Sequence, residues 1–213
     1  MAIYLDLSHS ITDEMPIYPG DVHVSLKQVA TLQEEGHSNF ILSTGMHAGT
    51  HLDGPMHLTS SLTRIAELPI EMFAGPGFLM NAVGQKIIDL PESALDRLTP
   101  GSVVLFYTGH DLFYDQKAYY LTYPVISEKT AEQLVNKKVK IVGMDCPSPD
   151  YAPFKIHDLL LNNHILIIEN LTNLASLLPY HEFELLAFPL KIRADSSPVR
   201  VVARINDSIR SYK

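Results

Sequence analysis

The chain has 213 residues, of which 46% are hydrophobic and 19% are charged, so it can bury a sizeable core and is not disordered by composition. Its 16 basic and 24 acidic residues give a net charge of −8, which disfavours a nonspecific nucleic-acid binder because that class needs a basic surface. The one cysteine, Cys146, excludes an intramolecular disulfide framework and a cysteine-rich zinc site. The 10 histidines therefore stand out as the side chains best suited to bind a metal or carry protons.

Apolar runs rich in β-branched and aromatic residues predict strands along the whole chain. The expected strands cover residues 2–7, 22–32, 39–44, 77–83, 102–107, 139–144, 165–168, 183–191 and 199–205. Short helices are expected at residues 92–98, 128–136, 157–163 and 171–178, the second of them with Ser127 as its N-cap. Many strands with a few short helices predict an α/β or α+β fold, and the length suits a single domain over residues 1–213.

The sequence contains no recognisable targeting or membrane segment. The first 15 residues lack a basic stretch followed by an apolar one, so they do not resemble a secretory signal. No apolar segment reaches the roughly 20 residues that a membrane-spanning helix needs. We therefore expect a cytoplasmic protein that acts without a membrane or nucleic-acid partner.

The most informative segment is HAGTHLDGPMH, residues 47–57, which places His47, His51, Asp53 and His57 at odd positions. Alternate residues of an extended chain share a face, yet a flat strand at about 3.3 Å per residue would separate His47 and His51 by about 13 Å. That distance is too long for two ligands of one ion. The glycines and the proline of the segment disfavour a helix and allow the chain to curl. We therefore expect a glycine-kinked turn that presents two imidazoles and one carboxylate.

Such a turn has the chemistry of a metal site. Two histidines and one carboxylate bind Zn²⁺, Mn²⁺ or Fe²⁺ and leave a coordination position open for water, which is typical of catalytic sites. The alternative is that these are solvated histidines beside a glycine-rich loop. Four potential ligands within eleven residues favour the metal site.

A second candidate group lies around the apolar run at residues 165–168. Glu169 directly follows that run, and a carboxylate at the end of a buried strand is costly unless it is paired or metal-bound. Function often lies at the carboxyl ends of strands. Alternatively, Glu169 interacts with the dipole of the helix expected to follow it. Neither interpretation prevails on this segment alone, and His157 and His164, taken singly, are more typical of surface or capping residues.

The eleven-residue segment resembles the motif H-x-G-T-H-x-D-x-P-x-H of the metal-dependent cyclase/formamidase family, whose best-known members are the bacterial kynurenine formamidases. Further segments resemble this family's proline-glycine loop, Thr-Gly stretch, Asp-x-Pro-Ser turn and His-to-Glu spacing. They are PIYPGD at 16–21, TGHD at 108–111, GMDCPSPD at 143–150, and His157 with Glu169 twelve residues later. The resemblance thus runs over nearly the whole chain.

The resemblance implies two divalent ions, taken as two Zn²⁺ with Mn²⁺ as the alternative. His47, His51 and Asp53 would bind the first ion. Asp53 would bridge to a second ion that His157 also holds, and Glu169 would contact both. The fold implied is a swivelling β/β/α domain, an α/β fold with a central β core and flanking short helices. Members of the family generally assemble as homodimers or homotetramers.

The reaction implied is hydrolysis of an amide by metal-activated water, with His57 as the general acid/base. N-formylkynurenine, an intermediate of tryptophan catabolism, is the leading substrate. Kynurenine formamidases carry a substrate-facing tryptophan where this chain has Tyr18. Tyrosine can still stack on an aniline ring, but its smaller face and its hydroxyl also suit other substrates, such as the cyclic amide isatin.

Other classes of protein remain as competitors. A cysteine hydrolase based on Cys146 is disfavoured because no helix N-terminus is expected there to lower the pKa of the thiol. Ser148 lacks the G-x-S-x-G context of a serine nucleophile. A noncatalytic metal-binding module would use the same histidines in a closed shell of ligands. For His110 and Asp150 we expect structural roles.

Overall fold

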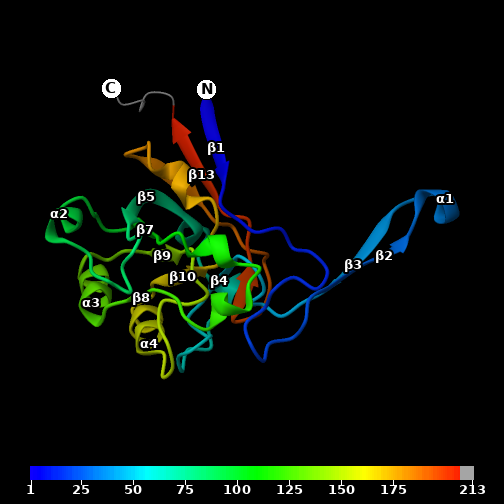
Figure 1. Ribbon diagram of the computed structural model, residues 1–213, viewed down its shortest axis with the longest axis horizontal. Helices are drawn as coiled ribbons and strands as arrows, with labels where there is room; N and C mark the ends of the chain where they lie inside the picture. Colours follow the sequence, from blue (N-terminus) through cyan, green and yellow to red (C-terminus); the bar gives the residue numbers. More distant parts are fainter. Residues whose placement is uncertain (207–213) are drawn as a thin grey trace.

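The computed structural model describes residues 1–206, and its centre is a nine-stranded mixed sheet (Figure 1). In sheet order the strands are β1 (Ala2–Asp6), β13 (Val202–Asn206), β11 (Phe183–Leu186), β5 (Ala74–Asn81), β7 (Val103–Tyr107), β9 (Ile141–Met144), β10 (Leu166–Glu169), β4 (His51–Asp53) and β12 (Ser196–Pro198). Neighbouring strands among β5, β7, β9 and β10 are parallel, and the strands on either side of this group run antiparallel to their neighbours.

The parallel centre of the sheet is apolar on both faces. Val104, Phe106 and Val142 pack into one core, whereas Val103 and Leu105 pack into a second core on the opposite face. Successive residues of a strand point to opposite faces, so a strand covered on both sides reads as a continuous apolar run. This is why the runs at residues 102–107 and 139–144 could be identified as buried strands.

Short helices flank the main sheet, except α1 (Leu32–Glu35), which lies at the end of the hairpin of residues 25–43 (Figure 1). The α-helices are α1 (Leu32–Glu35), α2 (Glu92–Leu95), α3 (Glu128–Asn136) and α4 (Lys155–Asn162). The 3₁₀ helices are η1 (Ile65–Glu67), η2 (Ile70–Phe73), η3 (His110–Phe113), η4 (Lys117–Tyr120) and η5 (Leu174–Leu177). Figure 1 shows α3 and α4 side by side, and they contribute to the first core. The expected N-cap is present, because the Ser127 hydroxyl accepts a hydrogen bond from the Thr130 amide at 3.1 Å. The predicted α/β class with a central β core and flanking short helices is confirmed.

Two small sheets lie outside the main one. Strands β2 (Ser25–Ala30) and β3 (Asn39–Ser43) form a hairpin that extends away from the body of the molecule (Figure 1). Strands β6 (Ile87–Ile88) and β8 (Val125–Ile126) pair in parallel near α3. None of the helices in residues 1–206 has the length and apolar character that a bilayer crossing requires.

Several predicted elements were wrong in extent or type. The helix expected at residues 171–178 is only the 3₁₀ turn η5, because Asn170 and Asn173 adopt left-handed backbone angles, with φ of 55° and 58°, that interrupt a helix. The strand expected at 183–191 ends at Leu186. The short strand β12 was missed, since SSP has little of the composition of a strand.

Candidate metal centre

The edge of the sheet at β10, β4 and β12 brings together residues that are far apart in sequence. In the antiparallel pair of β10 and β4, Glu169 lies opposite His51. On the other side of β4, Ser196 lies opposite Asp53. Directly opposed residues in a sheet point to the same face, so this register gathers the polar side chains of three strands on one face. The turn that precedes β4 brings the His47 ring to 5.1 Å from the His51 ring, as the expected curl required.

Two groups of potential ligands result, and they share one carboxylate. Ligand atoms of His47, Asp53 and His57 lie within 4.8 Å of one another, as do those of His51, Asp53 and Glu169. His47 Nδ1 is 3.0 Å from Asp53 Oδ1, and His51 Nε2 is 3.3 Å from Glu169 Oε2. Asp53 belongs to both groups, as a carboxylate that bridges two metal ions would. The grouping also places His57 at ligand distance, so geometry alone does not separate a ligand from a proton carrier at this position.

The residues of this site fit divalent metal ions. His51 Nδ1 donates its hydrogen to the carbonyl oxygen of Gly49 at 2.8 Å, which directs the Nε2 lone pair into the site. His51 Nε2 and Asp53 Oδ2 are buried and have no hydrogen-bond partner among the described residues. Burying a polar atom without a hydrogen-bond partner is energetically unfavourable unless another group interacts with it. Imidazole nitrogens and carboxylate oxygens are the donors that Zn²⁺ and Mn²⁺ accept.

His157 extends the site from the first turn of α4. Its Nδ1 lies 2.6 Å from Asp150 Oδ1, and its Nε2 lies 3.1 Å from Glu169 Oε1. Asp150 also accepts a hydrogen bond from the backbone amide of Ile156 at 2.6 Å, so one carboxylate holds both the start of the helix and the imidazole. A carboxylate on the outer nitrogen of a histidine is the usual support of a metal ligand. The structural role expected for Asp150 is therefore to orient His157.

Asp195 is the site residue that sequence analysis missed. Its Oδ2 lies 2.9 Å from His47 Nε2 and 3.3 Å from His57 Nδ1. Asp195 is 148 positions from His47 and 138 positions from His57 in the sequence, and no local motif connects it with either histidine. The sequence holds no signal that places Asp195 at the site, because the neighbouring strand β12 was itself not predicted.

Opposite charges set the pKa values of the site. Burial lowers the pKa of His47, but hydrogen bonds to Asp195 and Asp53 outweigh burial and raise it to about 11. For His157, hydrogen bonds to Asp150 and Glu169 likewise outweigh burial and raise the pKa to about 10. Asp195 has its pKa lowered by hydrogen bonds from His47 and His57. The raised pKa values favour protonated His47 and His157 near neutral pH when no metal is bound.

A pocket lined by polar and apolar side chains opens over the site. Its polar lining includes His47, His51, His57, His157 and Glu169. Its apolar and aromatic lining consists of Tyr18, Leu58, Tyr120, Pro147 and Phe154. The Tyr18 ring packs edge-on against Tyr120, with 5.8 Å between the ring centroids. Tyr18 thus lies where sequence analysis expected a substrate-facing aromatic residue.

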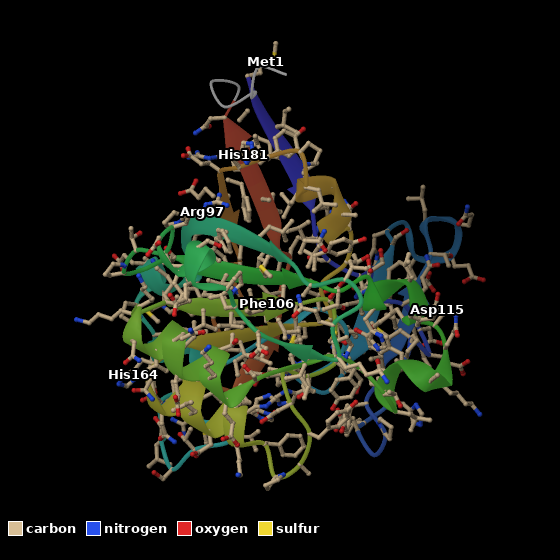
Figure 2. The ribbon with its side chains drawn as sticks, turned by 60° about the vertical axis from the view of Figure 1, so that its left-hand side comes forward. Met1, Arg97, Phe106, Asp115, His164 and His181 are labelled. Carbon is tan, nitrogen blue, oxygen red and sulfur yellow. The ribbon has the colours of Figure 1, made fainter. Side chains whose placement is uncertain are left out.

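Other cysteine, serine and histidine residues of the chain lie outside the two groups of potential ligands. Burial raises the pKa of the Cys146 thiol, which opposes formation of the thiolate that a cysteine hydrolase needs. Ser148 is buried, and its hydroxyl accepts the backbone N–H of Asp150. His110 Nε2 contacts the carbonyl oxygen of Tyr119 at 2.9 Å. His164 and His181 are exposed and lie on outer parts of the molecule (Figure 2).

The sequence matches the Cyclase family model over residues 5–151. It is 32% identical to the kynurenine formamidase of Bordetella avium, over 93% of this chain and 96% of that protein. The chain belongs to the cyclase family. A second relative in this family, the kynurenine formamidase of Geobacillus thermodenitrificans, is 30% identical over 94% of this chain and 97% of that protein.

Solved structures of low sequence identity share the fold of this cyclase-family chain. An isatin hydrolase bound to the product analogue thioisatinate has a TM-score of 0.85 at 21% identity, over 97% of this chain and 93% of that one. Isatin hydrolase A from Ralstonia solanacearum has a TM-score of 0.84 at 22% identity, over 96% and 92% of the two chains. With the relatives and the donor set taken together, this member of the cyclase family is a metal-dependent amide hydrolase, and the noncatalytic alternative is set aside.

Proposed function

We propose that this chain is an arylformamidase that hydrolyses N-formylkynurenine, a step of tryptophan catabolism, with two Zn²⁺ ions as its resident metals. The observation that carries the proposal is the pair of potential ligand groups that share Asp53, one with His47 and His57 and the other with His51 and Glu169. The aromatic side chains that line the pocket, Tyr18, Tyr120 and Phe154, and the two kynurenine formamidase relatives support an aromatic amide as substrate. Mn²⁺ is the alternative metal, since the same donors accept it.

Five residues would hold the ions, divided between them as the family resemblance implies. His47, His51 and Asp53 would bind one ion, and Asp53, His157 and Glu169 the other. When bound, such ions lower the pKa of a water molecule and stabilise negative charge on the oxygen of the attacked carbonyl. The protein contributes orientation, because each imidazole ligand has its other nitrogen fixed by an acceptor.

His57 would carry the proton that the reaction needs. Hydrolysis adds hydroxide to the formyl carbon and breaks the C–N bond, so the aniline nitrogen must gain a proton before it leaves. Imidazole is suited to this transfer because it exchanges protons near neutral pH. His57 Nδ1 faces Asp195 at 3.3 Å, which leaves Nε2 as the atom that would donate to the leaving nitrogen.

Tyr18 would bind the aromatic ring of the substrate. Tyr18 lines the pocket, its ring contacts Tyr120 edge-on, and its face could stack on an aniline. A cyclic amide such as isatin is the alternative substrate, because it also presents an aromatic ring fused to an amide. Steady-state turnover of both compounds by the purified protein would distinguish them, with the larger kcat/KM expected for N-formylkynurenine.

Metal removal tests the proposed chemistry. Protein treated with a chelator and then freed of it is expected to lose N-formylkynurenine hydrolysis, and added Zn²⁺ or Mn²⁺ is expected to restore the activity. A parallel sample that passes through the same steps without chelator controls for loss by handling. Full activity in protein whose metal content is shown to be negligible would refute the proposal.

A further inference from the structure

One carboxylate oxygen contacts two histidines with different proposed roles, one as a metal ligand and one as the proton carrier. Asp195 Oδ2 lies 2.9 Å from Nε2 of His47, a proposed ligand, and 3.3 Å from Nδ1 of His57, the proposed proton carrier. The two imidazole rings are neighbours, with 4.1 Å between their centroids. The side chains of the three residues are each between one quarter and one third exposed, so they form the open side of the site.

The backbone around Asp195 is held close to the histidine motif. The Gly54 amide donates to the Asp195 carbonyl at 3.0 Å, and a Cβ at Gly54 would lie 2.9 Å from that same oxygen. Residue 54 must therefore be glycine for this approach to occur. The next residue, Ser196, donates its hydroxyl hydrogen to Asp53 Oδ1 at 2.8 Å. The two-residue segment Asp195-Ser196 thus contacts a proposed ligand, the proposed bridging carboxylate and the proposed proton carrier.

The chemistry of a carboxylate decides which atoms of the two rings face the site. An ionised carboxylate only accepts hydrogen bonds, so each ring must donate N–H from the nitrogen that faces Asp195. For His47 this leaves Nδ1 available, and Nδ1 is the atom 3.0 Å from Asp53 Oδ1. For His57 it leaves Nε2 available. Asp195 therefore selects the orientation and the protonated nitrogen of both imidazoles.

We propose that Asp195 is a positioning residue shared by His47 and His57, which couples the geometry of a metal ligand to that of the proton carrier. The inference rests on the proposed function for the role of His57, but the contact with His47 stands independently of any substrate. The ion pairs of Asp195 are partly exposed, and exposed pairs add little to stability, so its contribution is to geometry.

The experiment compares Asp195→Asn and Asp195→Ala with the wild type. Asparagine retains the shape and one acceptor oxygen, which in the place of Oδ2 could still accept from both rings, whereas alanine removes the acceptor. Asp6→Asn is the matched control, because Asp6 is also a partly exposed carboxylate with close contacts, to Arg200 at 2.7 and 3.0 Å. Zn²⁺ affinity is measured by competition with a chromophoric chelator, and kcat and KM are measured on N-formylkynurenine.

Asp195→Ala is expected to bind Zn²⁺ about 10- to 100-fold more weakly and, when saturated with Zn²⁺, to lose about 10- to 100-fold in kcat with a small change in KM. Asp195→Asn, which keeps one acceptor oxygen, is expected to lose less in both measurements. Asp6→Asn is expected to match the wild type in both measurements. If either the Zn²⁺ affinity or kcat of Asp195→Ala stays at the wild-type value, the shared role is wrong. If the wild type hydrolyses no amide, the proposed function fails, and unchanged Zn²⁺ affinity would then overturn the inference by itself.

Discussion

The buried and open ends of the site use the same pair of groups, a histidine whose Nδ1 faces an aspartate, in different surroundings. At the buried end, the side chains of His157 and Asp150 are 3% and 9% exposed, and their atoms are 2.6 Å apart. At the open end, those of His57 and Asp195 are 24% and 33% exposed, and their atoms are 3.3 Å apart. The chemical groups alone therefore do not assign the two roles.

The surroundings of each pair support the roles that we propose for the two histidines. Asp150 also binds the backbone at the start of α4, so the imidazole of His157 is fixed as a ligand must be. Asp195 is shared between two rings and has no backbone amide as partner among the described contacts of its side chain. His57 and His157 both line the pocket that a substrate would enter, but the side chain of His57 is 24% exposed and that of His157 is 3% exposed. Burial thus favours a fixed ligand at one end, and the greater exposure of His57 favours proton transfer at the other.

The largest effect is expected from Asp150→Ala at the buried end. The substitution leaves the His157 imidazole buried without its closest partner, and breaking a buried pair in this way costs about 3–5 kcal/mol. We expect a lower free energy of unfolding, loss of one bound ion per chain and loss of most turnover. Denaturant unfolding and metal analysis measure these quantities.

Asp158→Ala is the matched control for that prediction, because Asp158 lies on the same helix and its contact is an exposed one with Asn162. It should retain metal content and turnover. An Asp150→Ala protein that keeps wild-type stability and metal content would show that the buried end does not depend on this carboxylate.

The stability of the metal-free protein should depend on pH through His157, over a higher pH range than for an ordinary histidine. After metal removal, protonated His157 would stabilise the folded state fully below about pH 6.5, the usual value for an unfolded histidine. Because its folded pKa is about 10, that contribution should decline as pH rises from about 7 to 10. Denaturant unfolding of chelator-treated protein across this range is expected to show a loss on the order of a few kcal/mol.

His157→Gln supplies the comparison, since the variant lacks the titrating group and should show a smaller decline over the same range. Metal binding to the wild type near pH 8 should release protons, which calorimetry in buffers of different ionisation enthalpy would detect. Equal pH profiles for wild type and variant would contradict the expected charge at the buried end.

A smaller effect is expected in the pocket beside the open end. Tyr18→Ala removes the ring proposed to stack on the substrate, so KM for N-formylkynurenine should rise about 5- to 10-fold with little change in metal content. Tyr18→Trp, which restores the residue seen in kynurenine formamidases, should lower KM. Tyr4→Ala controls for loss of a tyrosine at an exposed position on β1. An unchanged KM in Tyr18→Ala would remove Tyr18 from the substrate site.

The smallest effect on turnover is expected far from either end, in the hairpin of β2 and β3. Phe40, Ile41 and Leu42 are about half exposed there, although neighbouring large apolar side chains are usually buried within a protein or against a partner. We propose that a second copy of the chain covers them in the homodimer or homotetramer that the family resemblance implies. Replacing Phe40 and Ile41 by serine should lower the mass measured by light scattering, and an unchanged mass would exclude this surface.

Sequence analysis anticipated the parts of the site that are encoded locally. The spacing of His47, His51 and Asp53 indicated a curled metal-binding turn because Gly49 lies between the ligands and Gly54 and Pro55 follow them. Glu169 and His157 were assigned only through the family resemblance, since their spacing alone left both roles open. The structure brings these residues together through the pairing of β4 with β10.

The rest of the site and fold depended on long-range contacts. Asp195 reaches the site because β12 pairs with β4, and SSP carries too little strand character for that pairing to be predicted. The helix expected after Glu169 failed because Asn170 turns the chain with a left-handed backbone, and its side-chain NH₂ donates to the Gly49 carbonyl at 3.0 Å. A tertiary contact therefore outweighed the local helical pattern.

The central claim is that His57 transfers a proton at the open end and does not hold a metal. The most direct measurement is metal content per chain together with single-turnover hydrolysis for His57→Ala and the wild type. We predict equal metal content and a rate lower by about 10²- to 10⁴-fold, the usual contribution of a general acid. Loss of one ion per chain in His57→Ala would contradict the account and make His57 a ligand.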